Sequence, residues 1–162
     1  MKKQLGPTDV IFPVPAALVV SGCGAAANII TIAWIGILSS TPPTIGISLR
    51  KSRYSHELIH QQQEFTVNLP SAQLFRQVDF CGITSGRKHH KAQELGFTLL
   101  PGSVINTPIL QECPYNIECK VTREVELGDY TLFMAEIVET HINEEHFDPA
   151  NRAKINIASL DP

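Results

Sequence analysis

The sequence predicts a mainly β protein, built as a β-barrel with a few short helices. Strand-like segments dominate the chain, and they do not alternate with helices as a parallel sheet would require. Two long alternating segments, residues 116–127 and 130–142, are separated by Gly128-Asp129, a pair typical of hairpin turns. A length of 162 residues fits one core. Residues 1–162 are therefore expected to form a single domain.

The first part of the chain predicts buried strands, because residues 10–49 contain no Asp, Glu, Lys or Arg. Residues 16–22 and 28–34 are apolar runs separated by a small-residue turn, which is the pattern of strands buried on both faces. Pro42-Pro43 predicts a break, and residues 44–50 follow as a third strand.

Short helices are expected in the middle of the chain. Ser55 stands where it can cap a helix, and Glu57 is favourable in the first turn. Pro70 ends a strand, and Gly96 ends a helix. The predicted elements are a helix at residues 55–63, a strand at 64–70, an amphipathic helix at 72–80, a helix at 91–96 and an extended excursion at 97–114.

The charge pattern excludes one large class of partners. A formal net charge of −3 argues against a dedicated nucleic-acid binder, because such proteins present a basic face. Positive charge is nevertheless concentrated in two short stretches. The first basic cluster is Arg50, Lys51 and Arg53, and the second is Arg87, Lys88 and Lys91. Like charges so close together repel unless an anion or acidic neighbours lie between them, so the alternatives are solvated loops and an anion site.

The four cysteines are Cys23, Cys81, Cys113 and Cys119. They form no C-x-x-C pair, so we expect a reduced, cytoplasmic chain whose thiols are buried. The MKK start and the apolar run ending at Cys23 also resemble a bacterial lipoprotein signal, with Cys23 as the acylated residue. Pro13 and Pro15 break the short helix of such a signal, and glycine and polar residues interrupt any membrane span. No membrane contact is therefore expected.

A metal motif supplies another alternative. His56-Glu57-Leu58-Ile59-His60 matches the H-E-x-x-H pattern, in which two imidazoles hold zinc and the glutamate acts as general base. A third ligand is not evident at a typical spacing. An ordinary solvated helix is the favoured interpretation, and no metal is expected.

Both basic clusters lie beside features that favour an anion. Ser52 and Ser55 stand where a strand ends and a helix begins, and the free N–H groups of a helix start attract negative charge. Small and hydroxyl residues that allow close backbone approach precede Lys91 in the second cluster: Gly82, Thr84, Ser85 and Gly86. We expect both clusters to grip one phosphate-bearing ligand. The chain has neither a P-loop nor a G-x-G-x-x-G fingerprint, so that ligand is expected on a different fold.

Seven short pieces occur in one order: Asn28-x-x-Thr31-x-Ala33-Trp34, Pro42-Pro43, Arg53-Tyr54-Ser55, Glu64-Phe65-Thr66-Val67-Asn68-Leu69-Pro70, Asp79-Phe80-Cys81-Gly82-x-x-Ser85-Gly86, Ile117-Glu118-Cys119-Lys120 and Leu127-Gly128-Asp129. Each piece alone is weakly specific. Together, from about residue 13 to about residue 142, they closely resemble the flavoredoxin branch of the flavin reductase-like proteins. Ile117 stands where the family often has Leu.

The resemblance implies an FMN-binding split β-barrel of the Greek-key type, usually a homodimer with a flavin at or near each subunit interface. It implies that the first basic cluster, with Ser52 and Ser55, holds the FMN phosphate. It further implies that two strands line the isoalloxazine ring. The residues expected to bind FMN are Asn28, Thr31, Ala33, Trp34, Ser48, Leu49, Arg50, Lys51, Ser52, Ser55, Cys81, Gly82, Ser85, Gly86 and Lys91.

A second wall of the flavin site is implied near the second basic cluster. Backbone N–H groups near Cys81, Gly82 and Gly86, and the ammonium of Lys91, are expected to stabilise negative charge on the reduced ring or the phosphate. FMN carries the chemistry, and Lys91 and His90 are the candidate catalytic residues.

Two departures from the family pattern bear on function. The family commonly has an acidic residue, Lys and an aromatic residue after Ser-Gly, whereas this chain has His90-Lys91-Ala92. These altered neighbours leave the choice of substrate open. The family also usually continues beyond a Leu-Asp-Pro such as residues 160–162, so the alternatives are that this chain lacks the family's last segment and that the segment is unseen.

The favoured function is an FMN oxidoreductase that accepts hydride from NADH or NADPH, or electrons from a protein donor. Free flavin, ferric iron or a redox-protein partner would then accept the electrons. The alternatives are a non-catalytic flavin-binding module, a lipid-anchored surface protein acylated at Cys23, and a zinc hydrolase built on His56 and His60. Neither nucleic acid nor a membrane is expected as a partner.

Overall fold

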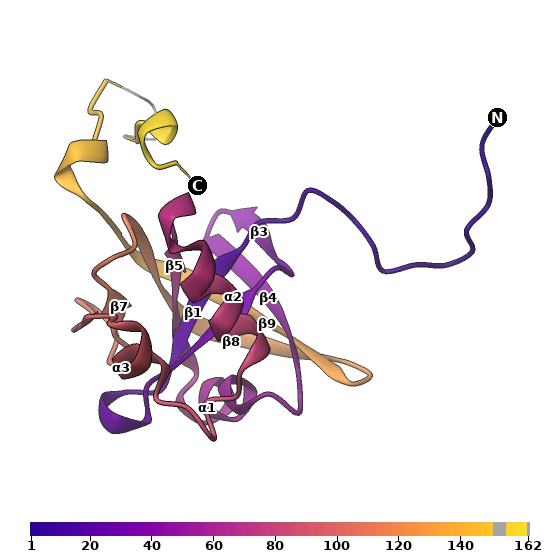
Figure 1. Ribbon diagram of the computed structural model, residues 1–162, viewed down its shortest axis with the longest axis horizontal. Helices are drawn as coiled ribbons and strands as arrows, with labels where there is room; N and C mark the ends of the chain where they lie inside the picture. Colours follow the sequence, from indigo (N-terminus) through magenta and orange to yellow (C-terminus); the bar gives the residue numbers. More distant parts are fainter. Residues whose placement is uncertain (151–154, 162) are drawn as a thin grey trace.

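The computed structural model describes residues 1–150 and 155–161, and its centre is an antiparallel sheet of seven strands (Figure 1). The strand order across this sheet is β2-β1-β5-β8-β9-β4-β3. The strands are β1 (Ala17–Ser21), β2 (Asn28–Ile32), β3 (Ile35–Ser40), β4 (Pro43–Arg50), β5 (Glu64–Leu69), β8 (Tyr115–Leu127) and β9 (Tyr130–Ile142). A small second sheet pairs β6 (Leu99–Leu100) with β7 (Ile109–Leu110).

The described part of the chain contains three α-helices, α1 (Tyr54–Gln62), α2 (Phe75–Ile83) and α3 (Lys91–Leu95). Single 3-10 turns occur at Gly24–Ala26, Ala72–Leu74, Glu144–His146 and Ile157–Ser159. Gly96 ends α3 with a positive φ of 72°, as the sequence predicted. Helix α2 runs past its predicted end at residue 80, so Cys81 and Gly82 are helical.

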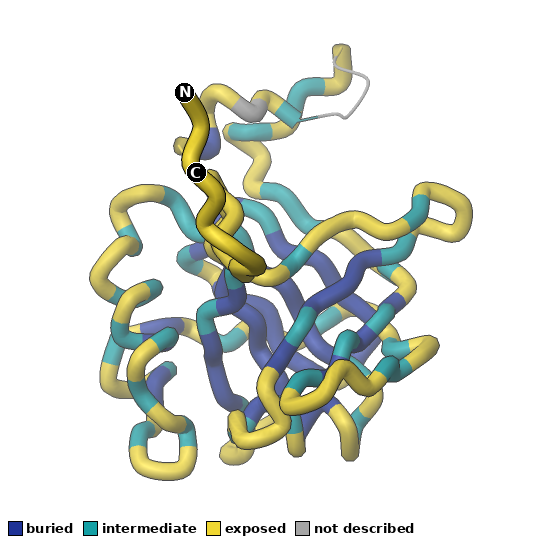
Figure 2. Tube along the Cα trace, turned by 90° about the vertical axis from the view of Figure 1, so that its right-hand side faces the viewer, coloured by how far each residue is buried: buried dark blue, intermediate teal, exposed yellow. Residues whose placement is uncertain are grey.

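Strand β1 is buried on both faces, which explains the uncharged stretch of sequence around it. Ala17 and Val19 pack in the main core with large side chains such as Phe65 and Phe133. Leu18 and Val20 pack in a second apolar cluster with residues of α2 and α3. Figure 2 shows the buried residues concentrated along these central strands. The later part of the run that also matched a lipoprotein signal, Ala17–Ser21, therefore lies in the interior of the sheet.

Strand β3 was not predicted, and it forms a hairpin with β4. Pro43 is the first residue of β4, a position where the missing N–H of proline is tolerated. The break expected at Pro42-Pro43 is therefore the turn of the hairpin formed by β3 and β4.

The two edge strands of the sheet meet through a very short link. β2 lies at one edge and β3 at the other, yet only Ala33 and Trp34 separate them in the chain. The N–H of Ser48 on β4 donates to the carbonyl of Trp34 at 2.9 Å. The sheet therefore curls into a barrel that is not closed by strand pairing, which confirms the predicted split barrel.

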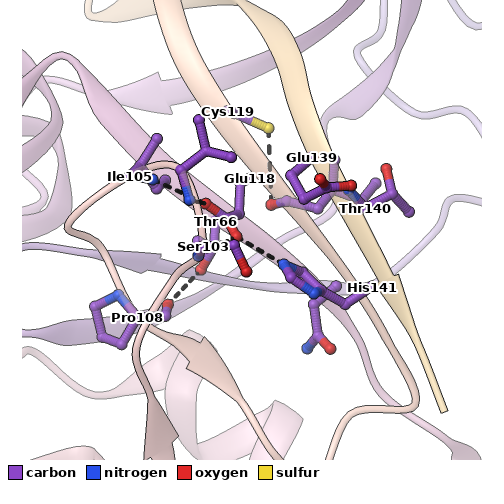
Figure 3. A network of polar contacts seen from close by, with 12 residues as sticks. Thr66, Ser103, Ile105, Pro108, Glu118, Cys119, Glu139, Thr140 and His141 are labelled. Atoms are coloured by element: carbon purple, nitrogen blue, oxygen red, sulfur yellow. Dashed lines mark hydrogen bonds and ion pairs between the residues drawn. The ribbon is translucent and has the colours of Figure 1, made fainter.

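The long hairpin of β8 and β9 is confirmed, and it anchors the irregular excursion of residues 97–114. Glu118 on β8 is fully buried. Its carboxylate accepts hydrogen bonds from the N–H groups of Ser103, Val104 and Ile105 at 2.7, 2.8 and 2.9 Å (Figure 3). His141 on β9 lies 2.6 Å from the same carboxylate. One buried side chain thus holds residues 103–105 of this loop against β8.

The N-terminal residues 1–16 are exposed and extend away from the sheet (Figure 1). In the part of the chain that the structure describes, no helix is both long enough and apolar enough to cross a membrane. Cys81, Cys113 and Cys119 are buried as expected. Cys23 is exposed, so the expectation of burial was wrong for this residue.

Candidate functional site

A first recess of about 330 Å³ lies where the barrel is split. Its walls come from the link between β2 and β3, the end of β4, the last turn of α2 and the start of β9. The lining residues are Ile30, Thr31, Ile32, Ala33, Trp34, Ser48, Leu49, Arg50, Arg53, Gly82 and Tyr130. Gly82 leaves room here, since an added Cβ would lie 3.4 Å from the Cβ of Thr31. The first recess therefore combines apolar surface with hydroxyl groups.

An aromatic pair and an arginine form one side of the first recess. The rings of Trp34 and Tyr130 have centroids 4.9 Å apart. Arg50 Nε donates to the Tyr130 hydroxyl at 2.6 Å, and this hydrogen bond raises the pKa of Arg50. Arg50 and Tyr130 are directly opposite each other in the register of β4 and β9. The pairing of β4 with β9, two strands far apart in the sequence, thus places these side chains together on one side of the first recess.

A second recess of about 400 Å³ adjoins the first, because Ile30, Arg50 and Arg53 line both. Its remaining lining residues are polar or basic in most cases: Asn28, Ser52, Tyr54, Ser55, Thr84, Ser85, Gly86 and Lys91. The N-terminal end of α1 faces it, and the first N–H groups of a helix lack partners within that helix. Cations, hydroxyls and a helix N-terminus together are the features that favour binding of an anion.

Ser55 does not cap α1 as the sequence predicted. The cap residue is Arg53, and no side chain makes a capping hydrogen bond. Ser55 is instead fully buried, and its Oγ accepts a hydrogen bond from Asn28 Nδ2 at 2.7 Å. The N–H of His56 donates to the carbonyl of Arg53 at 3.0 Å, so the N–H groups of Tyr54 and Ser55 are the ones left for a ligand.

Gly86 is required by a close approach between two segments. A Cβ built on Gly86 would overlap Oδ1 of Asn28, so any larger residue here requires that buried, hydrogen-bonded side chain to move. Asn28 thereby touches both Ser55 on α1 and the backbone at Gly86. The close approach at Gly86 is to the Asn28 side chain, and the predicted approach of this backbone to a ligand stays a prediction.

Lys91 is buried beneath the second recess. Its Nζ donates to the carbonyls of Ile29 and Cys81, both at 2.8 Å. Burial lowers the pKa of Lys91. An ammonium has three donors, so one remains for a ligand while the other two join α2 and α3 to β2.

Three of the predicted residues lie outside both recesses. Lys51 pairs with Glu126 at 3.2 Å. Cys81 is fully buried, and burial raises the pKa of its thiol to about 11. Its N–H and that of Gly82 lie in the last turn of α2, where N–H groups bond within the helix, so the expectation that they face the flavin was wrong. His90 is exposed at the start of α3.

The other predicted residues come together in the two recesses: Asn28, Thr31, Ala33, Trp34, Ser48, Leu49, Arg50, Ser52, Ser55, Gly82, Ser85, Gly86 and Lys91. Tyr130 lines the first recess but was not predicted as a site residue. The sequence feature that could have indicated it is its position directly after the Gly128-Asp129 turn. That signal is useful only once the register between β4 and β9 is known.

The H-E-x-x-H residues serve the packing of α1. His56 Nε2 lies 2.8 Å from Thr131 Oγ1, and burial lowers the pKa of His56. His60 Nδ1 lies 2.9 Å from a carboxylate oxygen of Glu124. Glu57 pairs with Arg87 at 2.7 Å. Each side chain of the pattern therefore has a different partner, and among the described residues no group of three or more potential ligands surrounds a common point.

Comparison with known proteins agrees with this geometry. The family model for the flavin reductase like domain matches residues 10–157. An uncharacterized protein of Archaeoglobus fulgidus is 38% identical over 134 residues, which cover 82% of this chain and 75% of the relative.

Two solved structures share the fold. Flavoredoxin of Desulfovibrio vulgaris (Miyazaki F) has a TM-score of 0.90 and 34% identity, over 100% of this chain and 86% of that chain. Flavoredoxin from Methanosarcina acetivorans has a TM-score of 0.87 and 27% identity, over 99% of this chain and 85% of that chain. With the family model spanning most of its length and the split sheet common to both structures, this chain belongs to the flavin reductase-like family.

Proposed function

We propose that this protein is an FMN-binding oxidoreductase. The observation that carries the proposal is the junction of the two recesses, which share Ile30, Arg50 and Arg53. One recess has apolar and hydroxyl walls, and the other is an anion site. FMN has the matching order of parts, a planar ring joined through a ribityl chain to a phosphate. Family membership supports a flavin-related oxidoreductase on independent grounds.

The second recess fits the phosphate. Arg50, Arg53 and the N-terminus of α1 supply positive potential, and the hydroxyls of Ser52 and Ser85 supply donors. Charge-assisted hydrogen bonds of this kind are roughly twice as strong as neutral ones, which suits a dianion. The third N–H of Lys91 adds a donor from below.

The first recess fits the ring. Thr31, Ala33 and Trp34 would lie along one side, with Ser48 and Leu49 on the neighbouring strand. Bound FMN accepts a hydride and releases electrons singly or in pairs, while the protein positions the ring and tunes its charge. Thr31 is itself held in place, because its hydroxyl donates to the carbonyl of Val78 on α2.

The electron donor in this proposal is NADH, NADPH or a reduced protein. The acceptor is free flavin, ferric iron or a redox-protein partner. A tightly held FMN favours transfer to a partner protein, whereas an exchangeable FMN favours reduction and release of flavin.

We also propose that the protein is a homodimer. Trp34, Ile37 and Leu38 are exposed beside the split, and so are Ile11 and Phe12 of the N-terminal segment. Contiguous apolar surface on a water-facing protein commonly marks an interface. Light scattering at micromolar concentration is expected to give twice the mass of the chain, and a monomer would contradict this part of the proposal.

A spectrum of the purified protein tests the main proposal. After gel filtration we expect the two visible absorption bands of flavin, or their appearance after addition of FMN. Anaerobic addition of NADH and then NADPH follows. Bleaching by either nucleotide identifies a hydride-accepting flavoprotein. Bands that remain with both nucleotides but bleach with a reduced protein donor identify an electron-transfer protein. Bands that neither the nucleotides nor a protein donor bleaches favour a non-catalytic flavin-binding module. A colourless protein that binds no added FMN contradicts the proposal.

A further inference from the structure

Arg87 belongs to the second basic cluster, yet it lines neither recess. Its guanidinium contacts α1 instead. Nη2 donates to Oε2 of Glu57 at 2.7 Å, and Cζ lies 4.9 Å from the centre of the Tyr54 ring. We call these two contacts the Arg87 bridge. The bridge joins the segment between α2 and α3 to the first turns of α1.

The Arg87 bridge connects the two walls of the second recess. One wall is the start of α1, with Tyr54 and Ser55, and the other is the segment that carries Ser85 and Gly86. Opening or closing of these walls changes the distance between the helix N-terminus and the hydroxyl of Ser85. Both groups must reach one anion at the same time, so the separation of the walls determines how well the anion is bound.

Other hydrogen bonds of this segment do not fix that separation. The N–H groups of Lys88 and His89 donate to the carbonyl of Ser85 within the segment. His89 pairs with Glu94 on α3 at 2.9 Å. Asn28 spans the same two walls from the inside, through its hydrogen bond to Ser55 and its contact with Gly86. Among the hydrogen bonds of residues 1–150, the contact of Arg87 with Glu57 is the one made by this segment itself to α1, and both side chains are about half exposed. The bridge is therefore the outer connection between the walls.

We propose that Arg87 is a positioning residue that sets the width of the second recess for the phosphate of FMN and does not itself bind the phosphate. This inference rests on the proposed function. It also gives Glu57, left over from the H-E-x-x-H pattern, a role as the partner of Arg87. An arginine is needed because a planar guanidinium donates to a carboxylate and packs on an aromatic ring at once, which an ammonium does poorly.

The test compares two ligands that differ only in the phosphate. Flavin-free protein is titrated with FMN and with riboflavin, and flavin fluorescence is followed for the wild type, Arg87→Ala, Glu57→Ala, the double variant and Arg87→Lys. Arg87→Ala, which removes the ion pair and the contact with the Tyr54 ring, is expected to weaken FMN binding roughly fivefold to tenfold. Glu57→Ala, which removes the ion pair alone, is expected to weaken it roughly twofold to fivefold. Riboflavin affinity is expected to stay within about twofold of the wild type, because riboflavin makes no use of the anion site. The double variant should bind FMN no more weakly than Arg87→Ala, and Arg87→Lys should recover part of the loss.

Each contrary outcome has a distinct meaning. Unchanged or tighter FMN binding by Glu57→Ala would overturn the positioning role, since an arginine released from Glu57 would then be free to bind the phosphate directly. Equal weakening of FMN and riboflavin would also overturn it, because a general loss of structure affects both ligands. Thermal melting of every variant reports such a loss independently. Failure of the wild type to bind either flavin would overturn the proposed function together with this inference, whereas insensitivity of the variants in a flavin-binding wild type would overturn this inference alone.

Discussion

Replacement of Glu118 by Gln is expected to destabilise the protein strongly. In the wild type Oε1 accepts hydrogen bonds from the Ser103 N–H and from His141, while Oε2 accepts from the N–H groups of Val104 and Ile105. A glutamine presents one oxygen and one NH₂ group. In one orientation the NH₂ group faces the N–H groups of Val104 and Ile105, and two hydrogen bonds are lost. In the other it faces the Ser103 N–H and His141, and one or two are lost, depending on the tautomer of the His141 ring.

The size of the effect follows from those lost bonds. A buried donor left without an acceptor costs about 1–3 kcal/mol, so the loss of one or two bonds costs about 1–6 kcal/mol. Ser103 and Val104 lie near the surface, and water replaces part of the loss there, which leads us to expect about 2–4 kcal/mol. For a protein of this size that corresponds to a decrease in Tm of roughly 4–16 °C.

Glu64 supplies a matched control. It also holds the excursion, but one oxygen, Oε1, accepts all of its contacts, from the N–H groups of Asn106 and Thr107 and the Thr107 hydroxyl. A glutamine at position 64 keeps an oxygen there, so Glu64→Gln is expected to cost less than about 1 kcal/mol. Urea unfolding of the two variants and the wild type, followed by circular dichroism, measures both. Equal effects of the two substitutions would refute the reasoning from the number of acceptors.

The effect at position 118 also depends on pH. Burial opposes ionisation of Glu118, but hydrogen bonds from Ser103, His141, Val104 and Ile105 outweigh it and lower its pKa below the ordinary 4.5. A carboxyl group with a lowered pKa stabilises the folded state above its unfolded pKa, and this stability is lost as the pH falls through the folded pKa. The difference between wild type and Glu118→Gln is therefore expected to be full at pH 7 and to shrink below about pH 4. A difference that stays constant down to pH 3 would exclude the charged carboxylate as its cause.

Four further substitutions test the flavin site. Arg53→Ala is expected to weaken FMN binding by about tenfold or more. Lys51→Ala removes the same charge outside the recesses, so it should change FMN affinity by less than about twofold. Equal effects of the two substitutions on FMN affinity would show that it depends on net charge alone. Gly86→Ala places a Cβ against Asn28 and should weaken FMN binding, which fluorescence titration measures, while unchanged affinity would show that this approach is not needed. Lys91→Ala is expected to reduce flavin retention or lower the flavin potential in spectroelectrochemistry, and no change in either would remove Lys91 from the site.

Much of the fold was predictable because its signals are local. The hairpin of β8 and β9 has regular alternation and a glycine turn, and β1 is recognisable from its uncharged, β-branched sequence. Strand β3 was missed because Ile35–Ser40 contains Gly36 and two serines, and it lies at the edge of the sheet with little burial. Its strand conformation comes from pairing with β4, which is a tertiary effect that local propensity does not carry.

The site was predictable where sequence motifs coincide with it, and unpredictable where it depends on register or burial. Thr31 and Ser85 were found from the family pattern, and both line a recess. Tyr130 enters through the pairing of β4 with β9. Cys81 stands beside Gly82 in the motif, but successive helical residues point about 100° apart, so one lines the recess and the other is in the core.

The two-residue link from β2 to β3 limits how proteins built in this way can vary. A third residue at Ala33-Trp34 would move β3 along its own axis by about 3.3 Å and turn its side chains to the opposite face. Substitutions keep the backbone of the link unchanged, and insertions do not. We therefore expect new specificities to arise by exchange of side chains around the first recess, while the length of the link between β2 and β3 stays the same.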